Sequence, residues 1–517
     1  MSIFLACSPI LLLIVLLIIF KISGDKGAIL TLILTALVAL FAFHQPISGV
    51  SNAFLLGSLK AIFPILFIIV MAIYSYNVLL KTEKIEVIKQ QFSSISSDKT
   101  IQVLLITWGF GGLLEGMAGF GTAVAIPAAI LISLGYKPLF SAVVSLIANS
   151  VPTAFGGVGV PVLMLSEQAG VANIHHLSIN VVMQLSVMMF LVPLIIAFLT
   201  DRSKRAFLKN IILSLIIGGI SLVVQYIAAA YIGVQTPAIL GSLASIAVII
   251  LMGQIFKGEK SNTTFDHYGA KETFQAWSVY LFVIVLIIFS SSLFPGIKSW
   301  LSGLAQSSLN FHIDSLVYQN NEFVPQIIEK SWKVSWLTLA GFPLFIGSFL
   351  GGLIQGGSVK ELITLLGKTV VQLKATFITL ICLVGLSSIM EYSGMVTTIA
   401  LALASATGEF YPLFAPLVGS IGTFVTGSDT SSNILFGKLQ ADVATSLSAN
   451  GTTIDPSWLA AANTTGATGG KIISPQSIAI ATSACDQQGQ EGNILLAALP
   501  YAGIYIVVTG IMVYMFA

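Results

Sequence analysis

Apolar segments separated by short polar breaks recur along almost the whole chain. They lie near residues 3–20, 27–43, 55–80, 101–114, 119–135, 139–165, 178–199, 211–232, 236–256, 276–294, 334–356, 375–390, 395–407, 411–427, 470–484 and 493–516. A helix needs roughly 20 apolar residues to cross a bilayer, so several of these segments are too short to cross alone. The pattern predicts an all-α polytopic membrane protein with roughly 12–14 transmembrane helices, some of them broken helices or re-entrant hairpins.

Composition agrees with this class of protein. The chain has 517 residues, of which 56% are hydrophobic and 9% are charged, whereas a soluble domain carries about 25% charged residues. The net charge of +2 is too small to suggest nucleic-acid binding. Cys7, Cys382 and Cys485 are scattered in or beside apolar segments and indicate no disulfide framework. We see no zinc-type spacing, phosphate-binding loop, haem motif or dinucleotide fingerprint, so we expect neither a metal nor a cofactor.

Basic residues concentrate in three loops, at 81–100, 200–210 and 257–275. The positive-inside rule places these loops in the cytoplasm. The first charge, Lys21, follows the apolar run that begins at Ile3, so we expect this run to be a retained transmembrane helix rather than a signal peptide. This count puts the N-terminus outside, and the mixed-charge segment 295–333 is expected outside as well.

The sequence also suggests an internal repeat within a single domain that spans residues 1–517. Glu115 is followed by an apolar stretch and then by Pro138-Leu139-Phe140, and Glu391 is followed by an apolar stretch and then by Pro412-Leu413-Phe414. Each copy continues into a polar break, at 149–157 and at 423–433. Interrupted segments at corresponding places in two halves point to a transporter site, so we expect related halves at approximately 55–199 and 334–484.

Glu115 is the first candidate for ion coupling, because it lies in a glycine-rich stretch, 109–122, between two apolar segments. A charged residue at the centre of a membrane helix costs roughly 2.5–3.5 kcal/mol on insertion scales, so it usually faces a cavity or a partner. The glycines predict a broken helix, and irregular backbone is tolerated at membrane depth only where it is buried in protein or lines a wet cavity. The alternative role is a structural carboxylate that accepts backbone N–H bonds.

Two further carboxylates are candidates for carrying the coupling proton. Glu391 lies in the segment 387–394, where serines and a tyrosine could instead satisfy it structurally. Asp429 lies in the oxygen-rich cluster 427–433, which could bind substrate, carry a proton or hold a cation. The alternative for Asp429 is a helix cap, since the run that begins at Ile434 could start a helix.

Three blocks of the sequence resemble the bacterial L-lactate permease family. The run Glu115-Gly-Met-Ala-Gly-Phe-Gly-Thr-Ala-Val-Ala-Ile-Pro-Ala-Ala129 is similar to the signature region of that family, and the runs 427–433 and 470–476 resemble two more of its blocks. The likeness covers essentially the whole chain. It implies proton symport of L-lactate and similar small 2-hydroxymonocarboxylates, such as glycolate, across the bacterial plasma membrane. It also implies that the two halves are inverted repeats. Ala123 stands where the family is expected to prefer proline, which puts a local bend in doubt.

For such a substrate the helix breaks supply candidate binding groups. Half-helix N-termini near 149–153 and 428–433 would attract a carboxylate, and Lys471, in a glycine-rich stretch, is the candidate charge partner. The alternative for Lys471 is a lysine that snorkels to a membrane interface. The candidate substrate-binding residues are Asn149, Ser150, Thr153, Ser428, Thr430, Asn433 and Lys471.

Two other functions stay open at this point. One is sodium-coupled transport of another small carboxylate, because the 427–433 cluster offers many oxygen ligands. The other is an intramembrane enzyme, but the chain has neither a zincin motif nor a serine-nucleophile elbow, so we do not expect an enzyme. The residues alone predict an ion-coupled transporter of a small polar solute, and lactate comes from the resemblance.

Overall fold

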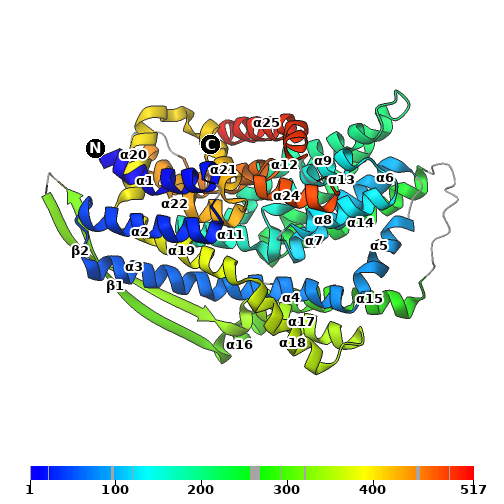
Figure 1. Cartoon of the computed structure of the whole chain (residues 1–517), viewed down its shortest axis with the longest axis horizontal. Coiled ribbons are helices and arrows are strands. Elements are labelled where there is room, and N and C mark those ends of the chain that lie inside the picture. Colours follow the sequence, from blue (N-terminus) through cyan, green and yellow to red (C-terminus); the bar gives the residue numbers. More distant parts are fainter. Residues whose placement is uncertain are drawn as a thin grey trace.

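The computed structural model describes residues 2–20, 22–94, 98–119, 121–256, 268–291, 293–319, 322–449, 454–487 and 490–517. Lys257 and Lys260, which belong to the third basic loop, lie outside the described residues. Within these ranges helices form almost the whole molecule, and many of them run along its longest axis (Figure 1). The prediction of a helical polytopic protein is therefore confirmed.

The N-terminal part contains a helical hairpin and a long kinked helix. The hairpin consists of α1 (Ser2–Ile14) and α2 (Gly24–Phe41). The kinked helix consists of α3 (Ile47–Lys60) and α4 (Phe67–Lys81), joined by a π-helical segment that contains Pro64. The kink falls at proline, which cannot donate a helical hydrogen bond. The short α5 (Lys84–Ser94) follows.

A helical hairpin followed by a broken helix forms the next unit. α6 (Lys99–Leu104) and α7 (Gly111–Met117), joined by a π-helical turn, pack against α8 (Thr122–Ser133). The broken helix consists of α9 (Pro138–Ala148), the single turn α10 (Ser150–Thr153) and α11 (Gly156–Ala169). Val158 adopts left-handed backbone at φ 61° within this break. For a β-branched residue this conformation stores strain, which is typical of functional sites.

The same element order returns near the C-terminus. α21 (Tyr411–Thr426) and α22 (Asp429–Ala449) form a helical hairpin that turns at Gly427. α23 (Pro456–Lys471) and α24 (Pro475–Ala484) form a broken helix with an interruption at 472–474, and α25 (Glu491–Met515) ends the chain.

The elements between these two units complete the bundle. They are α12 (Ile174–Thr200), α13 (Phe207–Ile227), α14 (Pro237–Ile255), α15 (Ala270–Phe289), α16 (Pro295–Leu304), β1 (Gln306–Gln319), β2 (Glu322–Ser335), α17 (Gly341–Ile354), α18 (Val359–Gln372), α19 (Lys374–Tyr392) and α20 (Met395–Thr407).

β1 and β2 form a hairpin that the apolar pattern of the sequence did not predict. The strands pair antiparallel, from Gln306 opposite Ser335 to Gln319 opposite Glu322, and β1 packs along α3 (Figure 1). Ile313, Trp332 and Val334 are buried. The indole N–H of Trp332 donates to the backbone carbonyl of Phe63 at the kink between α3 and α4. The expected external segment 295–333 is therefore folded rather than a simple loop.

The repeat takes a different register from the one expected from the sequence. The matched tripeptides at Pro138 and Pro412 begin α9 and α21, which hold different places in the two units. The structure instead places the interruption near 149–155 at the same position in its unit as the interruption at 472–474. The approximate halves 55–199 and 334–484 each contain a hairpin and a broken helix, and their inverted relationship remains a prediction.

Among the described residues, ten helical segments are long and apolar enough to cross a membrane. Four shorter apolar helices accompany them: Ile3–Leu17, Thr122–Ser133, Pro138–Ala148 and Gly341–Ile354. This agrees with the expectation that some apolar segments are too short to cross alone.

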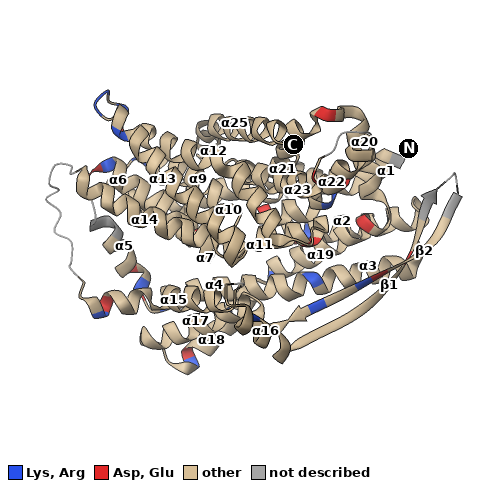
Figure 2. Cartoon of the chain, turned by 180° about the vertical axis from the view of Figure 1, so that it is seen from behind, with Lys and Arg blue, Asp and Glu red and all other residues tan. Residues whose placement is uncertain are grey.

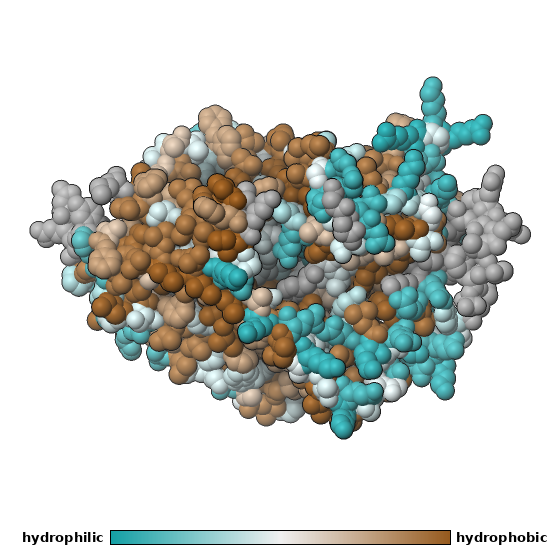
Figure 3. Space-filling view, viewed as in Figure 1, coloured by the Kyte–Doolittle hydropathy of each residue, from teal (hydrophilic) through white to brown (hydrophobic). Residues whose placement is uncertain are grey.

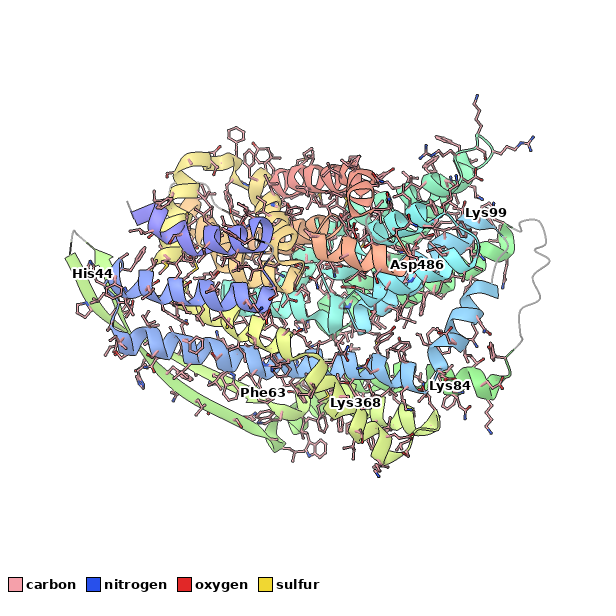
Figure 4. The ribbon with its side chains drawn as sticks, viewed as in Figure 1. His44, Phe63, Lys84, Lys99, Lys368 and Asp486 are labelled. Atoms are coloured by element: carbon pink, nitrogen blue, oxygen red, sulfur yellow. The ribbon has the colours of Figure 1, made fainter. Side chains whose placement is uncertain are left out.

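Labelled residues of the first basic loop lie together at one end of the molecule (Figure 4). Lys84 and Lys99 lie at one end of the long axis and His44 lies at the other, on the same side as the N-terminus (Figures 1 and 4). Few of the ribbon positions within the bundle are coloured as charged residues (Figure 2). On the face shown in Figure 3, apolar residues dominate one half, and hydrophilic residues gather toward the end that carries Lys84 and Lys99.

Candidate functional site

A cavity of about 790 Å³ lies where the two units meet the α1–α2 hairpin and α19. Its wall includes Glu115 at the end of α7, Asp429 at the start of α22, and Lys471 at the end of α23. Asp25 of α2 and Thr379 of α19 contribute from the other side. The volume falls within the range of roughly 300–1,000 Å³ that is common for ligand sites.

Five helices begin at the wall of this cavity. Four of them, α2, α8, α22 and α24, have first residues or caps that line it, at Gly24, Gly121, Asp429 and Pro475. The fifth, α11, returns to helical backbone at Val160, which also lines the cavity, after the left-handed residues 157–159. A helix N-terminus carries roughly half a positive charge and unpaired N–H groups, so it attracts anions. The convergence of several such ends gives the cavity a positive potential before any side chain is counted.

Lys471 is paired with Glu115 at this site. Lys471 Nζ donates to Glu115 Oε1 at 2.9 Å, and the two side chains are 13% and 3% exposed. Glu115 Oε2 is buried without a hydrogen-bond partner among the described residues. A side chain at Gly156 could not coexist with this pair, because a Cβ there would lie 2.6 Å from Glu115 Oε1. The pair joins the tip of the first hairpin to the second broken helix.

Asp429 is buried in the same wall but has a different partner. Thr464 Oγ1 lies 2.9 Å from each of its carboxylate oxygens and is the donor to them. Asn433 Nδ2 donates to Thr464 Oγ1 at 2.8 Å and to the carbonyl of Pro161 at 3.0 Å. Asn433 therefore supports Asp429 and holds α22 against α11.

Most of the predicted site residues lie in the cavity wall, and the others lie behind it or elsewhere in the molecule. Six candidates line the cavity: Glu115, Thr153, Ser428, Asp429, Thr430 and Lys471. Asn149, Ser150 and Asn433 are buried in the wall behind it and do not line it. Asn149 is paired with Thr153 within one turn of the broken helix, and Ser150 donates to the carbonyl of Ile147.

Glu391 does not lie with the other candidate coupling residues. It ends α19 outside the cavity wall and interacts electrostatically with Lys438 and Lys60. Lys438 pairs with Asp442 at 2.9 Å, and Lys60 lies 3.7 Å from Glu167. Glu391 thus belongs to a separate charged cluster that connects α3, α11, α19 and α22.

Several cavity residues were not identified from the sequence. Ser23, Gly24 and Asp25 come from the α1–α2 turn, which reads as an ordinary polar connection between apolar runs. Gln476 is exposed to the cavity and makes no side-chain hydrogen bond among the described residues. It lies in the block 470–476 that resembles the permease family, and this resemblance is the feature of the sequence from which Gln476 could have been identified.

Comparison with known proteins gives the family. The sequence profile of the L-lactate permeases matches residues 2–517. The chain is 38% identical over 459 residues to an L-lactate permease of Streptococcus iniae, which covers 88% of this chain and 93% of that protein. It is 33% identical over 539 residues to a glycolate permease of Escherichia coli, covering 99% and 95% of the two chains. It is 32% identical over 511 residues to an L-lactate permease of Bacillus subtilis, covering 92% and 88%.

These relatives are permeases rather than enzymes, and their similarity extends over nearly the full length of the helical bundle. The resemblance of the blocks at 115–129, 427–433 and 470–476 is therefore confirmed. The chain belongs to the L-lactate permease family and is a multi-pass permease of the cell membrane.

Proposed function

We propose that this permease takes up L-lactate and similar small 2-hydroxymonocarboxylates together with protons. The observation that carries the proposal is the cavity in which five helix N-termini surround the Lys471–Glu115 pair beside buried Asp429. Such a site offers positive potential for one carboxylate and contains groups that can bind a proton. The names of the relatives, lactate and glycolate permeases, support the substrate class.

Each part of the substrate has a partner of suitable chemistry in the cavity. The carboxylate fits Lys471 and the N-terminal N–H groups of α22 and α24. The 2-hydroxyl fits the side chains of Ser428, Thr430, Thr153 and Gln476, which line the same wall. Thr430 makes no side-chain hydrogen bond among the described residues, so its hydroxyl is available to a ligand.

The hydroxyl contacts bear on selectivity. A site built to bond a hydroxyl rejects an analogue that lacks it, because the polar groups of the site would then be buried unpaired. We therefore expect lactate and glycolate to compete with each other and propionate to compete poorly.

Sodium coupling is the alternative within transport. Among the described residues, no group of three or more histidine, cysteine, aspartate or glutamate side chains is arranged to hold a metal ion. Ser428 and Thr430 nevertheless provide oxygens next to Asp429, so the coupling ion is decided by flux measurements.

The test is uptake of labelled L-lactate into proteoliposomes that contain the purified chain. An acidic exterior without sodium is expected to drive accumulation, and a protonophore is expected to abolish it. Empty liposomes control for passive entry of lactic acid, and excess unlabelled propionate tests the hydroxyl requirement. Accumulation that needs a sodium gradient and ignores the pH gradient would replace proton coupling with sodium coupling.

A further inference from the structure

The two buried carboxylates of the cavity, Glu115 and Asp429, are balanced by different groups. Glu115 has a lysine ammonium 2.9 Å away. Asp429, which is 2% exposed, has one threonine hydroxyl shared by both of its oxygens and forms no ion pair among the described residues. An ionised carboxylate that is buried with so little compensation is costly, whereas the protonated form is not.

Thr464 is held in place by a chain of buried polar groups that all donate in one direction. Asn433 donates to Thr464 at 2.8 Å and accepts from Asn463 at 2.9 Å. Asn463 accepts from Gln440 at 3.3 Å, and Gln440 accepts from the hydroxyl of Tyr411 at 2.9 Å. Because Asn433 occupies the oxygen of Thr464 as a donor, the hydroxyl hydrogen of Thr464 is directed to Asp429. The chain therefore fixes the one hydrogen bond that favours the ionised form of Asp429.

The charged and titratable groups that face Asp429 are few. They are Lys471 of α23, Glu115 of α7 and Tyr505 of α25. Among the helices packed against α22, the described parts of α11, α19, α20 and α21 place no charged side chain in the cavity wall. Asp25 of α2 lines the wall as well. Lys471 is the single cationic side chain among the described residues of the wall, so the buried carboxylates of Glu115 and Asp429 compete for it with an incoming anion.

From this geometry we infer that Asp429 is the group that binds the coupling proton and that Thr464 is its positioning residue. Glu115 is the counter-ion with which the substrate carboxylate shares Lys471. This inference rests on the proposed lactate transport. The proton enters Asp429 from water in the cavity and returns to water on the other side, and no covalent bond other than the O–H bond forms or breaks.

This division of roles explains how proton and anion bind together. With Asp429 ionised, the wall carries three negative side chains, the buried Glu115 and Asp429 and the more exposed Asp25, against one positive side chain, and it repels lactate. With Asp429 neutral, Lys471 and Glu115 balance each other, and lactate can share Lys471 and the helix N-termini without a second uncompensated anion. Lactate affinity should therefore rise as Asp429 takes up its proton.

The experiment measures L-lactate binding calorimetrically to the purified chain in lipid nanodiscs between about pH 5 and about pH 8. For the wild type we expect the Kd to rise about tenfold per pH unit on the alkaline side of the transition. Asp429→Asn should bind lactate with an affinity that does not change with pH. Glu115→Gln should keep the wild-type slope. Asp442→Asn, on the same helix but outside the cavity, is the matched control and should also keep it.

Thr464 gives a second, independent readout. Thr464→Val removes the donor to the ionised carboxylate, so the midpoint of the pH dependence should move upward by about one unit or more. Thr464→Ser keeps the hydroxyl and should restore the wild-type midpoint. If Asp429→Asn does not fold, these two variants still test whether Asp429 binds the coupling proton.

The outcomes separate this inference from the proposed function. A wild-type slope in Asp429→Asn, or a flat profile in Glu115→Gln alone, would overturn the assignment of the proton to Asp429 while lactate transport stands. An unchanged midpoint in Thr464→Val would overturn the positioning role. Absence of lactate binding by the wild type at every pH would instead overturn the proposed function.

Discussion

Lys471 and Glu115 form a charge pair that is almost removed from solvent. Their side chains are 13% and 3% exposed, and the 2.9 Å contact is a charge-assisted hydrogen bond. Removing one partner of such a pair leaves an uncompensated buried charge, which typically lowers the free energy of unfolding by about 3–5 kcal/mol. Lys471 has three N–H donors, so it can bond an incoming carboxylate while it keeps its hydrogen bond to Glu115.

At this scale we predict that Lys471→Gln weakens lactate binding. A hydrogen bond to a charged group contributes about 1.5–3 kcal/mol, which corresponds to roughly 10–100-fold in Kd. Binding calorimetry with purified protein measures the change. Lys438→Gln, which alters a lysine outside the cavity, is the control and should bind lactate like the wild type. Equal affinities for the two variants would exclude Lys471 from the site.

The charged residues deep in the cavity wall could be predicted from the sequence because charges are rare in this chain. Glu115, Asp429 and Lys471 each stand out between apolar segments, and the structure brings all three to one cavity. Glu391 stands out equally, yet it lies in another charged cluster. The spacing of charged and apolar residues indicates which residues lie at membrane depth, but it does not show which helices face each other. Hydrogen-bond partners of the carboxylates, such as Thr464, cannot be told from other polar residues until the fold is known.

Close contact between two helices positions the second unit. α21 and α23 approach so closely that a Cβ at Gly466 would lie 1.8 Å from the carbonyl oxygen of Pro416, and one at Gly419 would lie 2.0 Å from the carbonyl oxygen of Asn463. Small residues at a helix interface allow backbones to pack in this way in membranes. The contact places Lys471, at the end of α23, beside the turn between α21 and α22.

At the element scale we therefore predict that Gly466→Ala destabilises the protein. The added methyl group must push two backbones apart, and overpacking of this kind costs typically about 1–3 kcal/mol. Thermal unfolding in detergent should show a lower melting temperature than for the wild type. Gly503→Ala on α25 is the control, because a Cβ there meets nothing within 4 Å. A melting temperature equal to that of Gly503→Ala would show that the helices can separate freely.

The elements themselves were predicted unevenly. Glycine and polar clusters marked the breaks at 149–155 and near 427 because such residues interrupt helices. The β1–β2 hairpin was not predicted because polar and apolar residues alternate along each 14-residue strand. Such alternation gives neither a continuous apolar segment nor the apolar face of a helix, which were the two patterns used to find elements. The register of the repeat was misread because three matching residues at Pro138 and Pro412 can begin helices with different roles.

In the whole molecule, the cavity of about 790 Å³ lies between the two hairpin-and-break units and the elements α2 and α19. The basic end, with Lys84 and Lys99, and the end with His44 lie on opposite sides of the long axis (Figure 4). A binding site held between helix breaks, within a bundle whose two ends differ in charge, is the arrangement expected of a carrier that opens to each side in turn.

The central claim is that this cavity is the lactate site, and protection of a cysteine in its wall tests the claim most directly. Gln476→Cys, in a background with Cys7, Cys382 and Cys485 replaced by alanine, would be labelled with a small charged thiol reagent. Ser308→Cys on the exposed face of β1 serves as the control. L-Lactate near 100 times its Kd should slow labelling of Gln476→Cys by about tenfold or more and leave Ser308→Cys unchanged. Labelling of Gln476→Cys at the same rate with and without saturating lactate, in protein that still transports it, would contradict the account.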